Sequence, residues 1–227
     1  MVGNFIVHAL LAVVPVVLAI TLHEAAHGYA ALALGDTTAR DQGRLTLNPL
    51  AHIDRMGTII LPGILLITQL LTIGRVAFMF GWAKPVPVSA WKFANPRRGM
   101  AIVALAGPAM NFFLVWLGAL ALRALADADV GAWLTTILYD FMLINMVLGL
   151  FNLLPIPPLD GGRVMVGILP ERLARSWAGL ERFGLLIVLT CILVLPSLFG
   201  INPIGDVLET VLPRAFRVAF WLAGYHE

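Results

Sequence analysis

Residues 5–34 read FIVHALLAVVPVVLAITLHEAAHGYAALAL, and the rest of the chain is organised around this stretch. About thirty residues at ~1.5 Å each exceed the hydrocarbon thickness of a bilayer, so the stretch predicts a membrane helix. Phe5 to Leu22 contains no Asp, Glu, Lys or Arg, yet His23-Glu24-Ala25-Ala26-His27 follows at once. Ionisable groups inside a membrane helix are costly, and they usually mark a functional site.

The pattern H-E-x-x-H predicts a metal site within this helix. Residues four apart lie on one face of a helix, so His23 and His27 can offer two ring nitrogens to one ion. Glu24 lies beside them, where its carboxylate can take a proton from a metal-bound water. The alternative interpretation is a cluster that only packs helices together, but His and Glu buried in lipid need partners.

The composition is that of an integral membrane protein. Hydrophobic residues make up 60% of the 227 residues and charged residues 12%, which is about half the charged fraction of a soluble domain. We therefore expect an all-α, polytopic membrane helical bundle that crosses a cell membrane several times, with the lipid bilayer around it. We expect a single membrane-embedded domain over residues 1–227, with its core at 5–163 and C-terminal helices at 164–227.

Charge and cysteine content narrow the possible functions. The net charge of +2 is small, and the basic residues cluster in loops beside apolar segments. This distribution suits orientation in a membrane better than it suits binding of nucleic acid. The single cysteine, Cys191, excludes an intrachain disulfide and a cysteine-based metal site. The oligomeric state remains open.

A third metal ligand is needed, because a catalytic zinc has three protein ligands and one open position. Asp160 stands out among the carboxylates, since Pro155, Pro157 and Pro158 end the preceding helix and Gly161-Gly162 follow. Two His and one carboxylate suit Zn²⁺, although iron and other divalent ions accept the same ligands. His52 is the other histidine near the first pair: it either approaches the metal or is a loop residue bonded to backbone.

Two further segments are irregular. Pro85-Val86-Pro87-Val88 excludes helix and favours extended backbone, which at membrane depth must be covered by protein or line a cavity. Its edge could pair with an extended peptide, and a plain surface loop is the alternative. Asn111 and Asn145 lie inside apolar helices and need polar partners there.

Three motifs occur in one order: His23 to His27, Gly107-Pro108-Ala109-Met110-Asn111, and Asn152 to Gly161 with Pro155-Ile156-Pro157-Pro158-Leu159-Asp160 inside it. Together they resemble the site-2 protease family of intramembrane zinc metalloproteases, in its small bacterial and archaeal branch without a PDZ domain. The resemblance runs from the first helix to about Arg163. The branch often has Pro at the position of Arg55, so the resemblance predicts no conformation for that turn.

The resemblance implies a function and a role for each site residue. His23, His27 and Asp160 would bind Zn²⁺, and Glu24 would be the catalytic base. Asn152 would help to hold the substrate backbone, and the region of Pro85, Val86, Pro87 and Val88 would form a membrane-associated β element. The substrate would be a membrane protein, cut in or near a transmembrane segment.

Two other functions are compatible with His and carboxylates in membrane helices. A divalent-cation transporter would need such residues along a path through several helices, and this chain has almost none outside the proposed site. A non-catalytic membrane scaffold would have no need of Glu24 or Asp160, and both are present.

The metal site also predicts a topology. The first helix and the helix that ends near Leu153 must end on the same side of the membrane if His27 and Asp160 share one ion. Residues 57–80, broken by Pro62-Gly63, are therefore expected to dip into the membrane and return. The loops rich in Lys and Arg place the active site towards the cytoplasmic side. Residues 203–224 could either span or lie in the interface.

Overall fold

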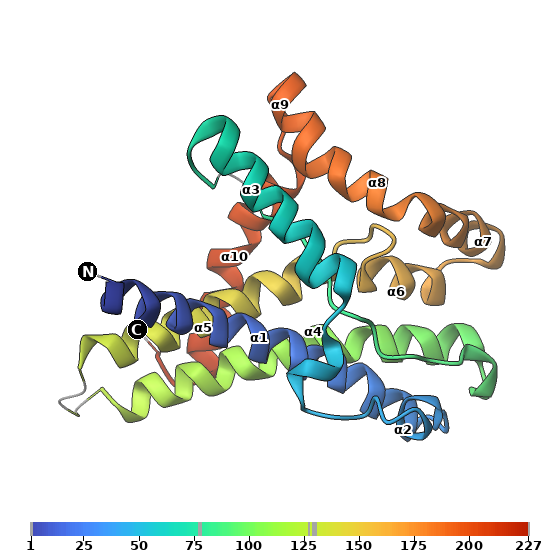
Figure 1. Ribbon diagram of the computed structural model, residues 1–227. Coiled ribbons are helices and arrows are strands. Elements are labelled where there is room, and N and C mark those ends of the chain that lie inside the picture. The colour runs from blue at the N-terminus through green and yellow to red at the C-terminus, as the bar shows by residue number, and fades with distance from the viewer. Residues whose placement is uncertain (1, 77–78, 127, 129–130, 227) are drawn as a thin grey trace.

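The computed structural model describes residues 2–76, 79–126, 128 and 131–226, and these fold into helices with no strand among them (Figure 1). The predicted all-α fold is confirmed. Five helical stretches of the described chain are long and apolar enough to cross a membrane, which supports a multi-pass membrane protein. They are Val13–Ala33, Arg55–Ile73, Pro96–Ala124, Trp133–Asn152 and Glu171–Phe199.

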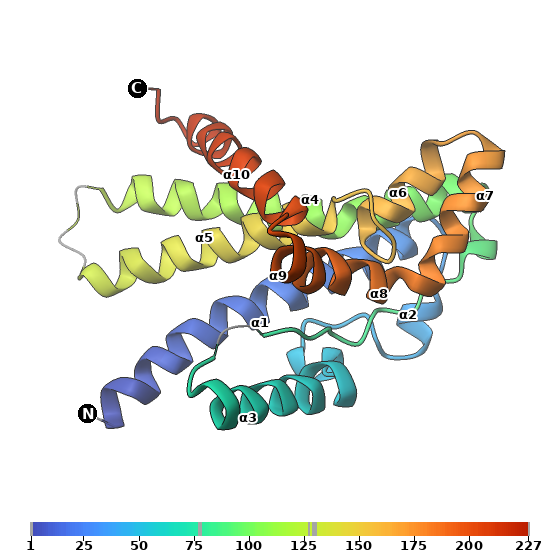
Figure 2. The ribbon, with the colours of Figure 1, turned by 90° about the horizontal axis from the view of Figure 1, so that it is seen from above.

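Three long helices form the centre of the bundle: α1 (Val2–Ala33), α4 (Pro96–Ala124) and α5 (Ala132–Asn152) (Figures 1 and 2). Small residues bring α4 and α5 together. A Cβ atom on Gly118 would lie 2.5 Å from Cγ of Met142, which is fully buried between the two helices. Close packing of this kind replaces the hydrophobic driving force that is absent between helices in lipid.

The C-terminal helix α10 (Pro203–Leu222) packs against α4 and α5. Its end is held by Arg123 of α4, whose guanidinium donates to the carbonyl of Ala223 at 2.7 Å. Within the described residues, α10 is not one of the stretches that have the length and hydropathy of a membrane span.

Residues 55–73 differ from the sequence prediction. A π-helical turn, Arg55–Ile60, continues directly into α3 (Leu61–Ile73), so this segment is one helix rather than a broken one. The Pro62-Gly63 pair lies at the junction of the π turn and α3 and does not interrupt the helix. Beyond α3 the chain runs back, and the N–H of Trp82 donates to the carbonyl of Gly57 at 3.2 Å.

The expected β element at Pro85–Val88 is also absent from the described structure, in which these residues are extended but unpaired as a strand. Pro85 and Pro87 have no N–H to give to a ladder, and the N–H of Val86 donates to the side chain of Glu24 instead.

The remaining helices are short. Before α4 come α2 (Thr38–Asp41) and two 3₁₀ turns, Pro49–His52 and Ala90–Lys92. After α5 the chain forms α6 (Asp160–Ile168), α7 (Glu171–Gly179) and a 3₁₀ turn, Leu180–Phe183. It then continues through α8 (Gly184–Leu189), a π turn (Thr190–Val194) and α9 (Leu195–Phe199).

Candidate metal centre

The structure brings together the three side chains that the sequence singles out as ligands. His23 and His27 lie one turn apart on α1, and Asp160 is the first residue of α6. The two Nε2 atoms are 3.0 Å apart, and Oδ2 of Asp160 lies 3.1 Å from that of His23 and 3.3 Å from that of His27. His52 is outside this group.

Hydrogen bonds on the far side of each ring fix which nitrogen faces the centre. Nδ1 of His27 lies 2.7 Å from the carbonyl of Val103, and Nδ1 of His23 lies 2.6 Å from Oδ1 of Asn111. Asn111 must present its oxygen, because its amide nitrogen donates to Oδ1 of Asn145 at 2.9 Å. Both rings therefore carry their proton on Nδ1 and direct the lone pair of Nε2 inward, the arrangement found in metal-binding histidines.

Three lone-pair atoms thus face one another across 3.0 to 3.3 Å. Oδ2 of Asp160 is buried and has no hydrogen-bond donor among the described residues. Such an arrangement is repulsive unless a cation lies between the atoms. Tetrahedral zinc with bonds of ~2.0–2.2 Å would separate its ligand atoms by about 3.3 Å, so these residues fit Zn²⁺.

Gly107 and Asn111 are site residues whose roles the sequence did not reveal. A Cβ atom on Gly107 would lie 2.5 Å from Nε2 of His27 and 2.6 Å from Nε2 of His23, so α4 can approach these ring nitrogens only with glycine there. Asn111 and Asn145 were recognisable as amides that need partners in an apolar helix. Their link to His23 depends on the packing of α1 against α4 and α5, which no sequence motif records.

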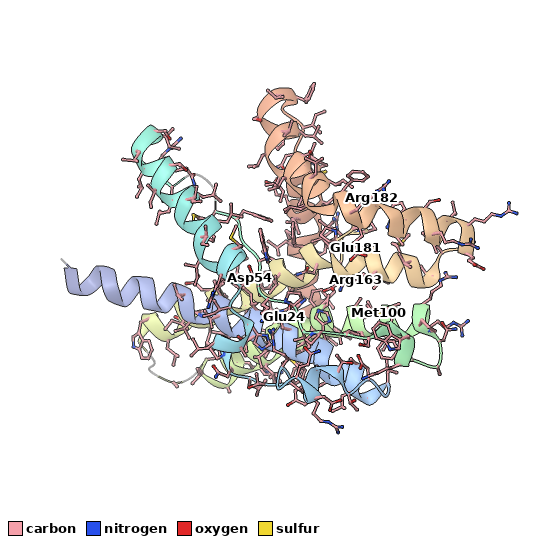
Figure 3. All side chains as sticks on the ribbon, turned by 45° about the vertical axis from the view of Figure 1, so that its right-hand side comes forward. Glu24, Asp54, Met100, Arg163, Glu181 and Arg182 are labelled. Atoms are coloured by element: carbon pink, nitrogen blue, oxygen red, sulfur yellow. The ribbon has the colours of Figure 1, made fainter. Side chains whose placement is uncertain are left out.

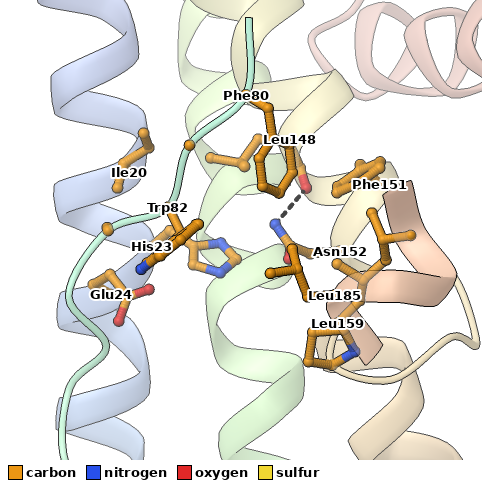
Figure 4. Close-up of a pocket in the computed structure, with 14 residues that line it drawn as sticks. Ile20, His23, Glu24, Phe80, Trp82, Leu148, Phe151, Asn152, Leu159 and Leu185 are labelled. Atoms are coloured by element: carbon orange, nitrogen blue, oxygen red, sulfur yellow. Dashed lines mark hydrogen bonds between the residues drawn. The ribbon is translucent and has the colours of Figure 1, made fainter. Parts of the chain in front are cut away.

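Glu24 lies beside the metal ligands, in the wall of a cavity of about 400 Å³ that His23, His27 and Asp160 also line. Its Oε2 accepts the N–H of Val86 at 3.0 Å, and Pro85, Val86 and Val88 line the same cavity. Glu24 and Asn152 both line a second cavity of about 380 Å³, which shares several residues with the first (Figure 4). The amide of Asn152 donates to the carbonyl of Leu148 at 3.0 Å.

The extended segment 82–89 is tied down along its length. The N–H of Lys84 donates to the carbonyl of His52 at 2.9 Å, and Arg44 donates to the carbonyl of Lys84 at 3.0 Å. At its far end, the N–H of Ser89 donates to the buried carboxylate of Asp36 at 2.6 Å. His52 is therefore a loop residue bonded to backbone: Nε2 of its ring lies 3.0 Å from the carbonyl of Thr46.

Comparison with known proteins gives one consistent match. The model of peptidase family M50 matches residues 121–195. The chain is 38% identical over 183 residues to the "Putative zinc metalloprotease YwhC" of Bacillus subtilis, which covers 78% of this chain and 77% of that protein. It is 32% identical to Rip2 of Mycolicibacterium smegmatis, a protein of the same description, over 80% of this chain and 65% of Rip2. No solved structure matches the chain.

Proposed function

Because the chain belongs to peptidase family M50, we propose that it is an intramembrane zinc metalloprotease that hydrolyses peptide bonds in or near transmembrane segments of other membrane proteins. The observation that carries this function is the set of three inward-facing lone pairs of His23, His27 and Asp160 within a bundle of membrane helices. A transporter or a non-catalytic scaffold is not favoured, since the relatives of this chain are described as zinc metalloproteases.

His23, His27 and Asp160 hold the zinc ion in this proposal. When bound, the zinc lowers the pKa of a water molecule and polarises the peptide carbonyl. Glu24 is the general base: its carboxylate takes the proton of the attacking water and returns it to the leaving nitrogen. Its position supports this role, because it lines the same cavity as the three ligands.

The substrate must be held in an extended form, since the carbonyls of a membrane helix are hidden in internal hydrogen bonds. We assign this task to the extended residues Pro85, Val86, Pro87 and Val88, and to Asn152. Their support is that Pro85, Val86, Val88 and Asn152 all line the cavity of Glu24. Since Pro85 and Pro87 carry no N–H and the N–H of Val86 is bonded to Glu24, the substrate backbone would be bound through the carbonyl groups of this segment.

We also propose that the active site faces the cytoplasm. The start of α4, the connection between α6 and α7, and α2 lie at one end of the bundle (Figure 1). Arg97 and Arg98 begin α4, and Arg172 and Arg175 lie on α7. An excess of basic residues marks the cytoplasmic side. The return of the chain from α3 to Gly57 supports a segment that leaves and re-enters on this same side.

The deciding experiment compares ligand and base variants in detergent, with zinc content and cleavage of a membrane-spanning peptide as the two measurements. Glu24→Gln should keep its zinc and lose at least ~100-fold in turnover, the usual scale for a general base. Asp160→Ala should lose both zinc and turnover, because two ligands remain. Undiminished cleavage by Glu24→Gln would overturn the mechanism, and full zinc occupancy in Asp160→Ala would remove it as a ligand.

A further inference from the structure

Arg163 introduces a permanent positive charge into the catalytic cavity. Among the described residues that line it, Arg163 is the one Lys or Arg, and Glu24 and Asp160 are the acidic residues. Arg163 follows Asp160 by three positions on α6, so it lies on the face of this helix that carries the metal ligand. The proposed mechanism gives it no task.

The side chain of Arg163 is only lightly engaged. One terminal nitrogen donates to Oε1 of Glu181 at 3.1 Å, and no other described residue accepts from its guanidinium. The two side chains are 43% and 48% exposed. A guanidinium has five N–H donors and pairs with carboxylates through two parallel hydrogen bonds, so most of its capacity is unused.

The ion pair joins the lining of the cavity to an element outside it. Glu181 lies in the 3₁₀ turn Leu180–Phe183, outside the cavity, while Arg163 lies in its wall between Glu181 and Glu24 (Figure 3). An exposed ion pair is weak, so a second carboxylate can share or displace Glu181 at little cost.

We propose that Arg163 is a specificity-determining residue that binds a carboxylate of the substrate close to the scissile bond. This inference rests on the proposed function. The carboxylate belongs either to an acidic side chain flanking the transmembrane segment or to the free C-terminus of a fragment that has already been cut. Both offer the planar pair of oxygens that a guanidinium recognises.

The test measures binding, so that it does not depend on turnover. Zinc-loaded Glu24→Gln protein in detergent is titrated with fluorescent peptides that carry Asp, Asn or Lys, walked residue by residue along the flank of one membrane segment. At one position the Asp peptide should bind on the order of fivefold more tightly than the Asn peptide, the upper range for an exposed ion pair. A second series compares a free C-terminal acid with its amide and identifies the source of the carboxylate.

Three added variants separate recognition from a structural bridge. Arg163→Gln should bring the Asp/Asn ratio of Kd values to one. The exchange Arg163→Glu with Glu181→Arg keeps an ion pair between α6 and the 3₁₀ turn, and it should shift the preference from Asp to Lys. Arg182→Gln is the matched control, because Arg182 lies over the ring of Phe183 and outside the lining of the cavity, and its ratio should match the parent's.

The outcomes distinguish this proposal from the proposed function. Equal Kd values for Asp, Asn, free-acid and amide peptides in the parent overturn the role of Arg163, even if the wild-type protein cleaves them. The role is also overturned if Arg163→Gln retains zinc and the parent's ratio. A clear ratio that Arg163 controls supports it, and absence of cleavage by wild-type protein would then count against the protease function alone.

Discussion

The amide of Asn111 orients the ring of His23 in the metal centre. It accepts from Nδ1 of His23 at 2.6 Å, and its own orientation is set by donation to Asn145. Partners of this kind typically account for 10- to 100-fold in metal affinity. The ring of His23 has no other described partner on that side, so its orientation depends on this hydrogen bond.

Replacing Asn111 by Leu should therefore lower zinc affinity by about 10- to 100-fold. Asn111→Asp keeps an acceptor for Nδ1 and should retain most of the affinity. Competition with a chelator of known affinity provides the measurement. Ile102→Leu, on the exposed side of α4, is the control. Equal affinities in Asn111→Leu and the control would show that packing alone orients His23.

A second prediction concerns Gly107, where the added Cβ atom of alanine would disturb the metal site. In Gly107→Ala the new Cβ would lie 2.5 Å from Nε2 of His27, which cannot be accommodated without moving a ligand. Zinc content and cleavage should both fall by at least ~10-fold, the scale at which disturbing a metal site is felt, while helix content by circular dichroism stays the same. Gly63→Ala, where no atom lies within 4 Å of the new Cβ, should leave both unchanged.

Among the structural elements, the extended segment 82–89 is fixed by two carboxylates: Asp36 anchors it at one end and Glu24 contacts it in the middle. Burial alone would raise the pKa of Asp36. Hydrogen bonds from Ser89, Thr38 and Lys92 outweigh burial and hold the pKa below its ordinary value. The folded state therefore favours the charged carboxylate of Asp36.

The sign of the resulting pH dependence follows from that shift. With a folded-state pKa below the unfolded value of ~3.9, Asp36 stabilises the segment above this pH, and the contribution is lost as pH falls through the folded-state pKa. Asp36→Asn should loosen the segment by about 1.5–3 kcal/mol, as expected for hydrogen bonds to a charged group, and should not show that acid transition. Hydrogen exchange over residues 84–92 measures both the loss of local stability and the acid transition. If Asp36→Asn shows the same acid transition as the wild-type protein, Asp36 is not its source.

Deletion of residues 85–88 tests what the segment does. If the segment binds substrate through its backbone, Val86→Ala should reduce cleavage only about twofold. The substitution removes two methyl groups and leaves the backbone in place. The deletion should abolish cleavage while the zinc content stays at the wild-type level, because none of the three ligands lies in the segment. Normal cleavage by the deletion variant would show that the segment is only a loop.

At the scale of the whole molecule, the sequence predicted what depends on local spacing. His23 and His27 follow from helical periodicity, and Asp160 follows from the proline-forced end of α5. The break expected at Pro62-Gly63 was wrong, because a π turn runs directly into α3 there. The hydrogen bond from the N–H of Val86 to Glu24 could not be predicted, because every residue except proline has a backbone N–H and the sequence does not mark this one. The amide pair Asn111–Asn145 needed the tertiary packing of α4 on α5.

Topology gives a prediction for the entire bundle. Ser89 and Thr38 are joined by a hydrogen bond of 2.9 Å, so the loops around them lie on one side. In a Cys191→Ser background, cysteines placed at Leu45 and Ala90 should react with an impermeant reagent from the cytoplasmic side. A cysteine at Ala128, beyond the far end of α4, should react from the opposite side. Labelling of Ala90 and Ala128 from the same side would contradict the arrangement.

The distribution of the three ligands along the chain has a consequence for biosynthesis. His23 and His27 leave the ribosome first, but Asp160 emerges only after α3, α4 and α5 have been made. Two imidazoles alone hold zinc weakly. The newborn chain therefore stays inactive while its early helices enter the membrane among other unfinished proteins. Peptide hydrolysis becomes possible only after α6 has been made and Asp160 joins the two histidines, so α1 to α5 enter the membrane before the site can act.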